Sequence, residues 1–186
     1  EEFGFKDLIV DINSMGDKEN RAPFLKDLVT YYKKHLDTLC KDCHERIKTN
    51  PLRLLDCKQA QCQPLKDNAP SSLSYLSNDA RSHFKEVLQY LEEMGIAYRI
   101  NNSLVRGLDY YSRTVFEIIK LDVDETGKEK EITITGGGRY NGLAKMMGSK
   151  KEVPAVGTGL GMERIMMFPE CKAPSPRIMK TPKVYF

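Results

Sequence analysis

The spacing of apolar residues changes at Gly95, and this change divides the chain into a helical part and a strand-rich part. From Arg21 to about Lys48, apolar residues recur every three or four positions, which predicts one continuous helical stripe. Pro23 falls near the start of this stripe, where its missing N–H donor does no harm. After Gly95 the period becomes two, which predicts strands over 96–100, 114–121, 129–135 and 153–158.

Other elements flank the helical stripe. Residues 6–13 alternate, which predicts a strand with one buried face, and residues 162–168 suit a short helix. Residues 79–94 form another helical pattern, which Ser77 or Asn78 can cap and Gly95 ends. This order predicts an α+β fold in which a mostly helical insert interrupts an antiparallel sheet. We divide the chain into a core strand, a helical insertion domain, the remaining core and a linker, at 1–16, 17–78, 79–170 and 171–186.

Composition and charge exclude several classes of protein. With 40% apolar and 30% charged residues, the chain is an ordinary globular mixture. No apolar run approaches the roughly 20 residues that span a bilayer, and the start at Glu1 lacks the features of a secretory signal. The formal net charge is +3, but residues 17–66 alone carry 11 Lys and Arg against 7 Asp and Glu. This excess indicates either a surface that faces phosphates or, as we favour from this feature alone, a solvated helical face.

Four of the five cysteines are clustered, as Cys40-x2-Cys43 and Cys57-x4-Cys62. Two such pairs are compatible with four thiolates around a tetrahedral structural zinc ion. The second spacing is looser than that of a typical zinc knuckle, and the first pair is expected late in the long helical stripe. Four reduced, partly buried cytosolic thiols are the alternative, and the sequence leaves both interpretations open.

Three short clusters in the strand-rich part can carry chemistry. Residues 104–111 place an arginine, a carboxylate and two tyrosines together, which suits an anion and a polar ligand, although an ordinary loop is the alternative. Residues 135–140 hold three consecutive glycines, which let the backbone approach a ligand, or form a bulge or a mobile turn. Residues 157–164 place glycines at alternate positions before an arginine, which opens one sheet face for a flat ligand. The spacing matches neither a P-loop nor a dinucleotide fingerprint.

Together and in this order, the three clusters resemble the catalytic domain of histidyl-tRNA synthetases. The first two are similar to the histidine-binding signatures of that family, and the third is similar to motif 3 of class II aminoacyl-tRNA synthetases. Part of the insert is similar to the insertion domain of bacterial members. The matching segments are 106–111, 136–140 and 157–164 in the core, and 39–43, 50–53 and 55–58 in the insert.

The resemblance implies a cytoplasmic, homodimeric class II enzyme without a membrane segment. It would activate L-histidine with ATP and Mg²⁺ and transfer it to tRNA(His), with the basic insert lying against the acceptor arm. Arg106 would bind histidine and neutralise the α-phosphate as the carboxylate displaces pyrophosphate. The other implied histidine-binding residues are Tyr110, Tyr111, Tyr140, Gly136 and Gly137. The implied ATP-binding residues are Arg164, which would hold the γ-phosphate, Gly159, Gly161 and Glu163.

Some features depart from the family pattern or leave roles open. Asn141 stands where aspartate is usual, Ser112 stands where threonine or asparagine is usual, and the role of Asp109 stays open. We expect motifs 1 and 2 before Glu1 and an anticodon-binding domain beginning near Lys183. The isolated chain is therefore expected not to form histidyl-adenylate at an appreciable rate.

The same sequence features allow two alternative functions. A regulatory paralogue would bind histidine without charging tRNA, but it would be expected to lose phosphate-binding arginines, whereas Arg106 and Arg164 are both present. A zinc-stapled RNA-binding module made of the insert alone would leave the glycine clusters unexplained.

Overall fold

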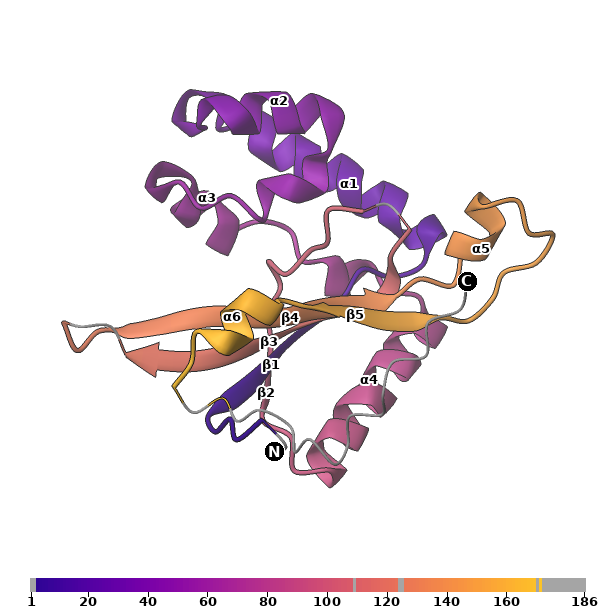
Figure 1. Cartoon of the computed structure of the whole chain (residues 1–186). Coiled ribbons are helices and arrows are strands. Elements are labelled where there is room, and N and C mark those ends of the chain that lie inside the picture. The colour runs from indigo at the N-terminus through magenta and orange to yellow at the C-terminus, as the bar shows by residue number, and fades with distance from the viewer. Residues whose placement is uncertain (1–2, 109, 124–125, 170, 172–186) are drawn as a thin grey trace, which may run out of the picture.

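Five strands form one sheet in the order β2-β1-β3-β4-β5 in the computed structural model, which describes residues 3–108, 110–123, 126–169 and 171 (Figure 1). The strands β1 and β2 are parallel, and the other neighbours are antiparallel. The α+β architecture with a mainly antiparallel sheet is therefore confirmed. The strands are β1 Leu8–Ser14, β2 Tyr98–Ile100, β3 Ser112–Val123, β4 Glu129–Arg139 and β5 Val156–Leu160.

Helices cover both faces of this sheet. Figure 1 shows α1, α2 and α3 of the insert on one side and α4 on the other. Short 3-10 turns at 36–38, 51–54, 60–62 and 72–75 connect the insert helices to one another and to α4. None of the helices in the described ranges is long and apolar enough to cross a membrane. The helices are α1 Lys18–Lys33, α2 Lys41–Thr49, α3 Gln63–Asp67, α4 Asn78–Glu93, α5 Leu143–Met146 and α6 Met162–Met166.

Strand β1 is buried on both faces near its end, whereas its sequence pattern predicts one buried face. Because residues directly opposite in a sheet share a face, Asp11 and Asn13 lie with Glu117 and Val115 on the side of the insert. Asp11 is 2% exposed and accepts hydrogen bonds from Arg99, while Asn13 is fully buried and donates to the carbonyl of Leu104 at 3.0 Å. The polar face is thus covered, and hydrogen bonds satisfy its buried groups.

The predicted continuous helical stripe is wrong, because the chain leaves the helix after Lys33 and starts α2 at Lys41. A straight helix over the whole stripe would be about 42 Å long, and its second half would extend away from the core. The turn folds α2 back, so that Leu39, Cys43 and Ile47 join the same apolar cluster as α1. It also places Cys40 and Cys43 at the beginning of a helix, where the sequence pattern predicts the end of one.

Pro23 also differs from its expected position at the start of a helix. Helix α1 already begins at Lys18, so Pro23 lies inside it and removes one backbone hydrogen bond. The helix persists because Phe24, Leu28 and Tyr32 are each at most 1% exposed. Burial of three such side chains contributes roughly 1.5–3 kcal/mol each, which exceeds the proline penalty of roughly 3 kcal/mol.

Helix α4 lies within one residue of its predicted bounds at each end, and Ser77 is the one of the two predicted residues that caps it. The hydroxyl of Ser77 accepts a hydrogen bond from the N–H of Ala80 at 3.2 Å, and Gly95 follows the helix with φ +65°. A cavity of about 390 Å³ remains between α4 and the sheet. Its walls are mainly apolar, and they also include His83 and Arg139.

This environment predicts that acid destabilises the fold through His83. Burial lowers the pKa of His83, and the positive charges of Arg139 and Arg113 lower it further, against the opposing effects of Glu86 and Asp17. The unfolded chain therefore binds the proton more tightly, and stability contributed by neutral His83 is lost as the pH falls below about 6.5. We expect His83→Gln to reduce the difference in thermal unfolding midpoint between pH 7.5 and pH 5.5.

The exposed His44 provides the matched control. His44→Gln is expected to keep the pH dependence of the wild type in the same thermal scans. An unchanged pH dependence in His83→Gln would contradict the predicted role of its burial.

Candidate active site on the glycine floor

The consecutive glycines lie inside strand β4, not in a bulge or a mobile turn after it. Gly136 is opposite Gly159 on β5, and Gly138 is opposite Gly157. Directly opposite residues share a sheet face, so these four glycines form two adjacent pairs without side chains. We call them the glycine floor. On β3, Glu117 is opposite Gly136 and Val115 is opposite Gly138, which places the floor on the side of the insert.

The guanidinium of Arg106 lies on this floor. A Cβ atom at Gly136 would be 2.6 Å from Nη1 and 2.8 Å from Nη2 of Arg106, so the guanidinium occupies the space that a side chain would fill. Nη1 donates a hydrogen bond to Oε1 of Glu117 at 2.9 Å, and both side chains are about one quarter exposed. The Cζ atom is also 5.7 Å from the centre of the Tyr111 ring, within the range of a cation–π contact.

The second predicted arginine, Arg164, reaches the same strand. Its Nη1 atom donates to the carbonyl of Thr133 at 2.8 Å, while the hydroxyl of Thr133 donates to Oε2 of Glu117 at 3.2 Å. Thr133 therefore connects both arginines, one through its backbone and the other through Glu117. The N–H of Gly161 donates to the carbonyl of Ile134 at 2.9 Å, which holds the start of α6 against β4.

Three tyrosine rings form an aromatic cluster beside Arg106. The ring centres of Tyr110 and Tyr111 are 4.7 Å apart, and Tyr140 is 5.8 Å from the first and 6.1 Å from the second in edge-to-face geometry. A hydrogen bond with Tyr111 raises the pKa of Tyr110, so its hydroxyl stays protonated. Arg21 donates a hydrogen bond to the carbonyl of Tyr111 and holds this segment in place. The cluster offers flat apolar walls with hydroxyl groups.

The remaining predicted site residues occupy different environments. A Cβ atom at Gly159 would meet no heavy atom within 4 Å, so the floor is open there. Gly137 serves strand packing, because a Cβ atom would be 2.2 Å from the carbonyl oxygen of Gly157. Glu163 is exposed on α6. Asp109 lies outside the described residues, as does the predicted linker beyond residue 171.

Asn141 and Ser112, the two residues that depart from the family pattern, contact each other. The N–H of Asn141 donates to the hydroxyl of Ser112 at 3.4 Å, and its side-chain oxygen accepts from Arg139 at 3.2 Å and from the N–H of Ala155 at 3.3 Å. An amide oxygen can accept these bonds as a carboxylate would. The departures therefore preserve a hydrogen-bonded junction between β3, β4 and the segment before β5.

Sequence reasoning missed Glu117 and Thr133, which position the arginines. Strand alternation contains a signal for Glu117, because it puts this carboxylate on the same face as the buried Val115 and Ile119. A carboxylate among buried positions requires a partner. Thr133 carries no such signal, because its role depends on the pairing of β3 with β4.

Sequence reasoning also missed a charged network on three strands. Arg99 on β2 pairs with Asp11 on β1 and donates from Nη1 to Glu131 on β4 at 2.6 Å. Hydrogen bonds to Glu131 and Asp11 raise the pKa of Arg99, and the bond from Arg99 lowers the pKa of Glu131. Because β3 lies between β1 and β4 in the sheet, the network bridges the face of the central strand.

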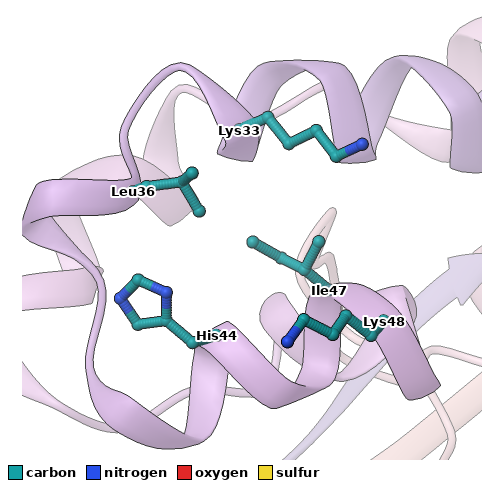
Figure 2. Close-up of a pocket in the computed structure, with 5 residues that line it drawn as sticks. All are labelled: Lys33, Leu36, His44, Ile47 and Lys48. Carbon is teal, nitrogen blue, oxygen red and sulfur yellow. The ribbon is translucent and has the colours of Figure 1, made fainter.

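The insert carries two further candidate features away from the glycine floor. An open groove of about 590 Å³ lies on the insert. Figure 2 shows the residues that line it, with Lys33 and Leu36 on one side and His44, Ile47 and Lys48 of α2 on the other. Among the described residues, Lys48 makes a single long ion pair, with Glu45 at 3.9 Å, and both of these side chains are more than 70% exposed. The four clustered cysteine sulfur atoms all lie within 4.8 Å of one another, so Cys40, Cys43, Cys57 and Cys62 could hold a metal ion.

Comparisons with known proteins agree with the fold. The structure superposes on an apo histidyl-tRNA synthetase from S. aureus with a TM-score of 0.63 and 32% sequence identity, over 89% of this chain and 38% of that chain. The sheet and its helices are thus those of a class II synthetase core. A family model described as histidyl-tRNA synthetase matches residues 13–165. The chain belongs to the histidyl-tRNA synthetase family.

Curated relatives show the same family and the extent of the match. The chain is 46% identical over 165 residues to a histidine–tRNA ligase of Halothermothrix orenii, covering 89% of this chain and 38% of the relative. It is 42% identical over 183 residues to a histidine–tRNA ligase of Desulforamulus reducens, covering 98% of this chain and 42% of the relative. The chain therefore spans about two fifths of the length of these relatives.

The different surroundings of Gly136 and Gly137 predict different effects of alanine. At Gly136 the added methyl group meets the end of the flexible Arg106 side chain, which can move. The free energy of unfolding of Gly136→Ala should therefore lie within about 1 kcal/mol of the wild-type value. At Gly137 it meets the backbone of β5, so we expect Gly137→Ala to lower the free energy of unfolding by roughly 1–3 kcal/mol or more. Urea denaturation of both variants measures the difference.

Gly142→Ala is the matched control, because a Cβ atom there meets nothing within 4 Å and φ is −79°. If Gly137→Ala were as stable as this control, the close approach of β4 to β5 would be refuted.

Proposed function

We propose that this chain forms part of a site that activates L-histidine with ATP and then transfers it to tRNA(His). The observation that carries the proposal is the guanidinium of Arg106, which lies on the glycine floor between Glu117 and the tyrosine cluster. A fixed cation, an open backbone surface and a hydroxyl-bearing aromatic wall suit a small amino acid beside a phosphate. Membership of the histidyl-tRNA synthetase family supports histidine as that amino acid.

In the proposed first step, a carboxylate oxygen of histidine attacks the α-phosphorus of ATP, and the bond to pyrophosphate breaks. Negative charge on the phosphoryl oxygens has to be stabilised in the transition state. Among the described residues, Arg106 donates a hydrogen bond to Glu117 through Nη1, and a guanidinium has five N–H donors. Arg106 therefore retains donors for the α-phosphate and the histidine carboxylate, and Glu117 holds it in a fixed orientation.

Of the other site residues, some would contact histidine and others would contact ATP. Tyr110, Tyr111 and Tyr140 would line the histidine pocket, with a hydroxyl contacting the imidazole. Gly159 offers open backbone to the nucleotide. Arg164 is exposed on α6, where it can exchange the Thr133 carbonyl for the γ-phosphate of ATP bound with Mg²⁺. Glu163 and Gly161 would lie beside that nucleotide.

We also propose that residues 17–78 act as an insertion domain that contacts tRNA, while residues 79–170 belong to the catalytic core. The groove in Figure 2 supports this role, because Lys33, His44 and Lys48 line it and the two lysines lack strong carboxylate partners among the described residues. Lysines in such surroundings can contact phosphates. Homodimer formation and a cytoplasmic location, which the resemblance implies, stay predictions.

The regulatory alternative predicts histidine binding without adenylate formation. Arg106, which pairs with Glu117, and Arg164, which contacts β4, favour the synthetase. Two cations along one glycine-rich strand suit the phosphates of ATP, which a protein that only binds histidine does not have to hold. An RNA-binding module made of the insert alone is disfavoured, since the insert and the sheet share one apolar core that includes Leu104, Val105 and Val115.

Loss of Arg106 should abolish most of the activation step. In the full-length protein that carries this sequence, we expect Arg106→Ala to reduce histidine-dependent pyrophosphate exchange roughly 100-fold or more, because a preorganised charge partner of the transition state is removed. Arg81→Ala, an exposed arginine on α4, is the control and should keep wild-type exchange. A loss of less than about tenfold in Arg106→Ala, equivalent to about 1.4 kcal/mol, would refute its catalytic role.

The lysines of the groove should affect tRNA and not histidine activation. We expect Lys33→Gln with Lys48→Gln to reduce the slope of log affinity for tRNA(His) against log salt by about 2, or about 1 per lysine. Pyrophosphate exchange should stay unchanged. Lys85→Gln, on the exposed face of α4, should change neither. Equal salt slopes for the double variant and the wild type would exclude this groove from the tRNA interface.

A further inference from the structure

The four clustered cysteines come from three separate segments of the insert, which pack into the same apolar cluster. Cys40 is the N-cap of α2, and Cys43 lies in the first turn of that helix. Cys57 follows the 3-10 turn at 51–54, and Cys62 ends the turn at 60–62 just before α3. The fold brings all four sulfur atoms within 4.8 Å of one another.

The distances between the sulfur atoms fit a shared metal ion better than a disulfide. Sulfur of Cys40 is 3.8 Å from sulfur of Cys57. Tetrahedral zinc has Zn–S bonds of about 2.3 Å, which puts neighbouring sulfur atoms about 3.8 Å apart. A disulfide needs about 2.05 Å. All five cysteines of the chain have free thiols in the structure.

The surroundings supply one backbone donor to sulfur and one buried hydroxyl that has no acceptor among the described residues. The N–H of Cys40 donates to the sulfur of Cys62 at 3.4 Å. The hydroxyl of Tyr32 is buried without a hydrogen-bond partner among the described residues, and Tyr32 lies in the same apolar cluster as Cys43, Cys57 and Cys62. A buried donor of this kind is costly unless it has an acceptor. Metal-bound thiolates are stronger acceptors than thiols, and hydrogen bonds from an outer shell support metal ligands in this way.

Burial restricts the chemistry that this cluster can perform. Cys43, Cys57 and Cys62 are at most 3% exposed, and only Cys40 is partly exposed. Four thiol ligands leave no open coordination position, which is typical of structural zinc and not of catalytic zinc. Soft sulfur ligands also disfavour Mg²⁺ and Ca²⁺, which prefer oxygen.

We propose that Cys40, Cys43, Cys57 and Cys62 bind one structural Zn²⁺ ion that joins the beginning of α2 to the segment leading into α3. Each thiol that coordinates the ion releases its proton, so the bound form is a tetrahedral zinc–tetrathiolate. The segments from residue 51 to 67 contain mainly 3-10 turns and a five-residue helix. Bonds from the four sulfur atoms to one zinc ion would hold them to the beginning of α2. This inference does not rest on the proposed synthetase activity.

The first test is the metal content of the wild-type chain, purified without added chelator. Native mass spectrometry with elemental analysis should find one zinc per chain, and the denatured protein should have the mass of the fully reduced chain. A metal-free native mass, iron in place of zinc, or a denatured mass lower by the hydrogens of a disulfide would each overturn the proposal.

Serine variants assign the ligands. Cys43→Ser and Cys57→Ser should each lower the zinc content at least tenfold and accelerate limited proteolysis within residues 37–71. Cys171→Ser is the matched control, because Cys171 packs against the separate cluster of Ile134, Ile165 and Phe168. It should keep one zinc per chain. Full zinc occupancy in either cluster variant would refute the assignment of that ligand.

A spectroscopic measurement keeps the test decisive if the serine variants fail to fold. Cobalt(II) exchanged into the wild-type chain should show the intense visible bands and sulfur-to-metal charge transfer of tetrahedral thiolate coordination, and Zn²⁺ should displace it. Weak bands typical of octahedral cobalt would show that the four thiols do not form the site.

Discussion

The missing side chain at Gly136 is the constraint on which the proposed site depends. The guanidinium of Arg106 occupies that space, 2.6 Å from where a Cβ atom would lie. Any other residue at this position would displace the cation from Glu117 and from the open floor at Gly159. Pairing of β3, β4 and β5 then brings the glycines into two facing pairs. Backbone geometry, more than side-chain chemistry, thus makes the room in which we propose that substrates bind.

Two kinds of ion pair occur in this sheet, and they have different consequences. The pair of Arg106 with Glu117 is partly exposed, and such pairs contribute only about 0–1 kcal/mol to stability. Its value lies in orientation, because Glu117 also accepts from Thr133, whose carbonyl accepts from Arg164. The network of Arg99 includes the nearly fully buried Asp11 and bridges β1, β2 and β4. That network belongs to the scaffold, whereas the first pair belongs to the site.

The insert is separate in sequence but continuous with the sheet in packing. Phe24, Leu28 and Tyr32 of α1 lie in the same apolar cluster as Val115 of β3 and the loop residues Leu104 and Val105. The second half of the insert relies on short turns, and the cysteines gather there. The insert and the segment that precedes Arg106 therefore share one core.

The sequence by itself determined the α+β fold class, the limits of α4 and the family, because these depend on local periodicity, on a cap such as Ser77 and on short motifs. It also pointed to Arg106, Arg164 and the glycines as one site. Only the tertiary structure showed the break between α1 and α2, the glycines inside β4 and the role of Glu117. Each of these depends on contacts between distant segments: burial of Leu39 and Cys43 against α1, and the register of β3 with β4 and β5. Local patterns carry no information about such pairings, so the break and the register appear only when the whole core is assembled.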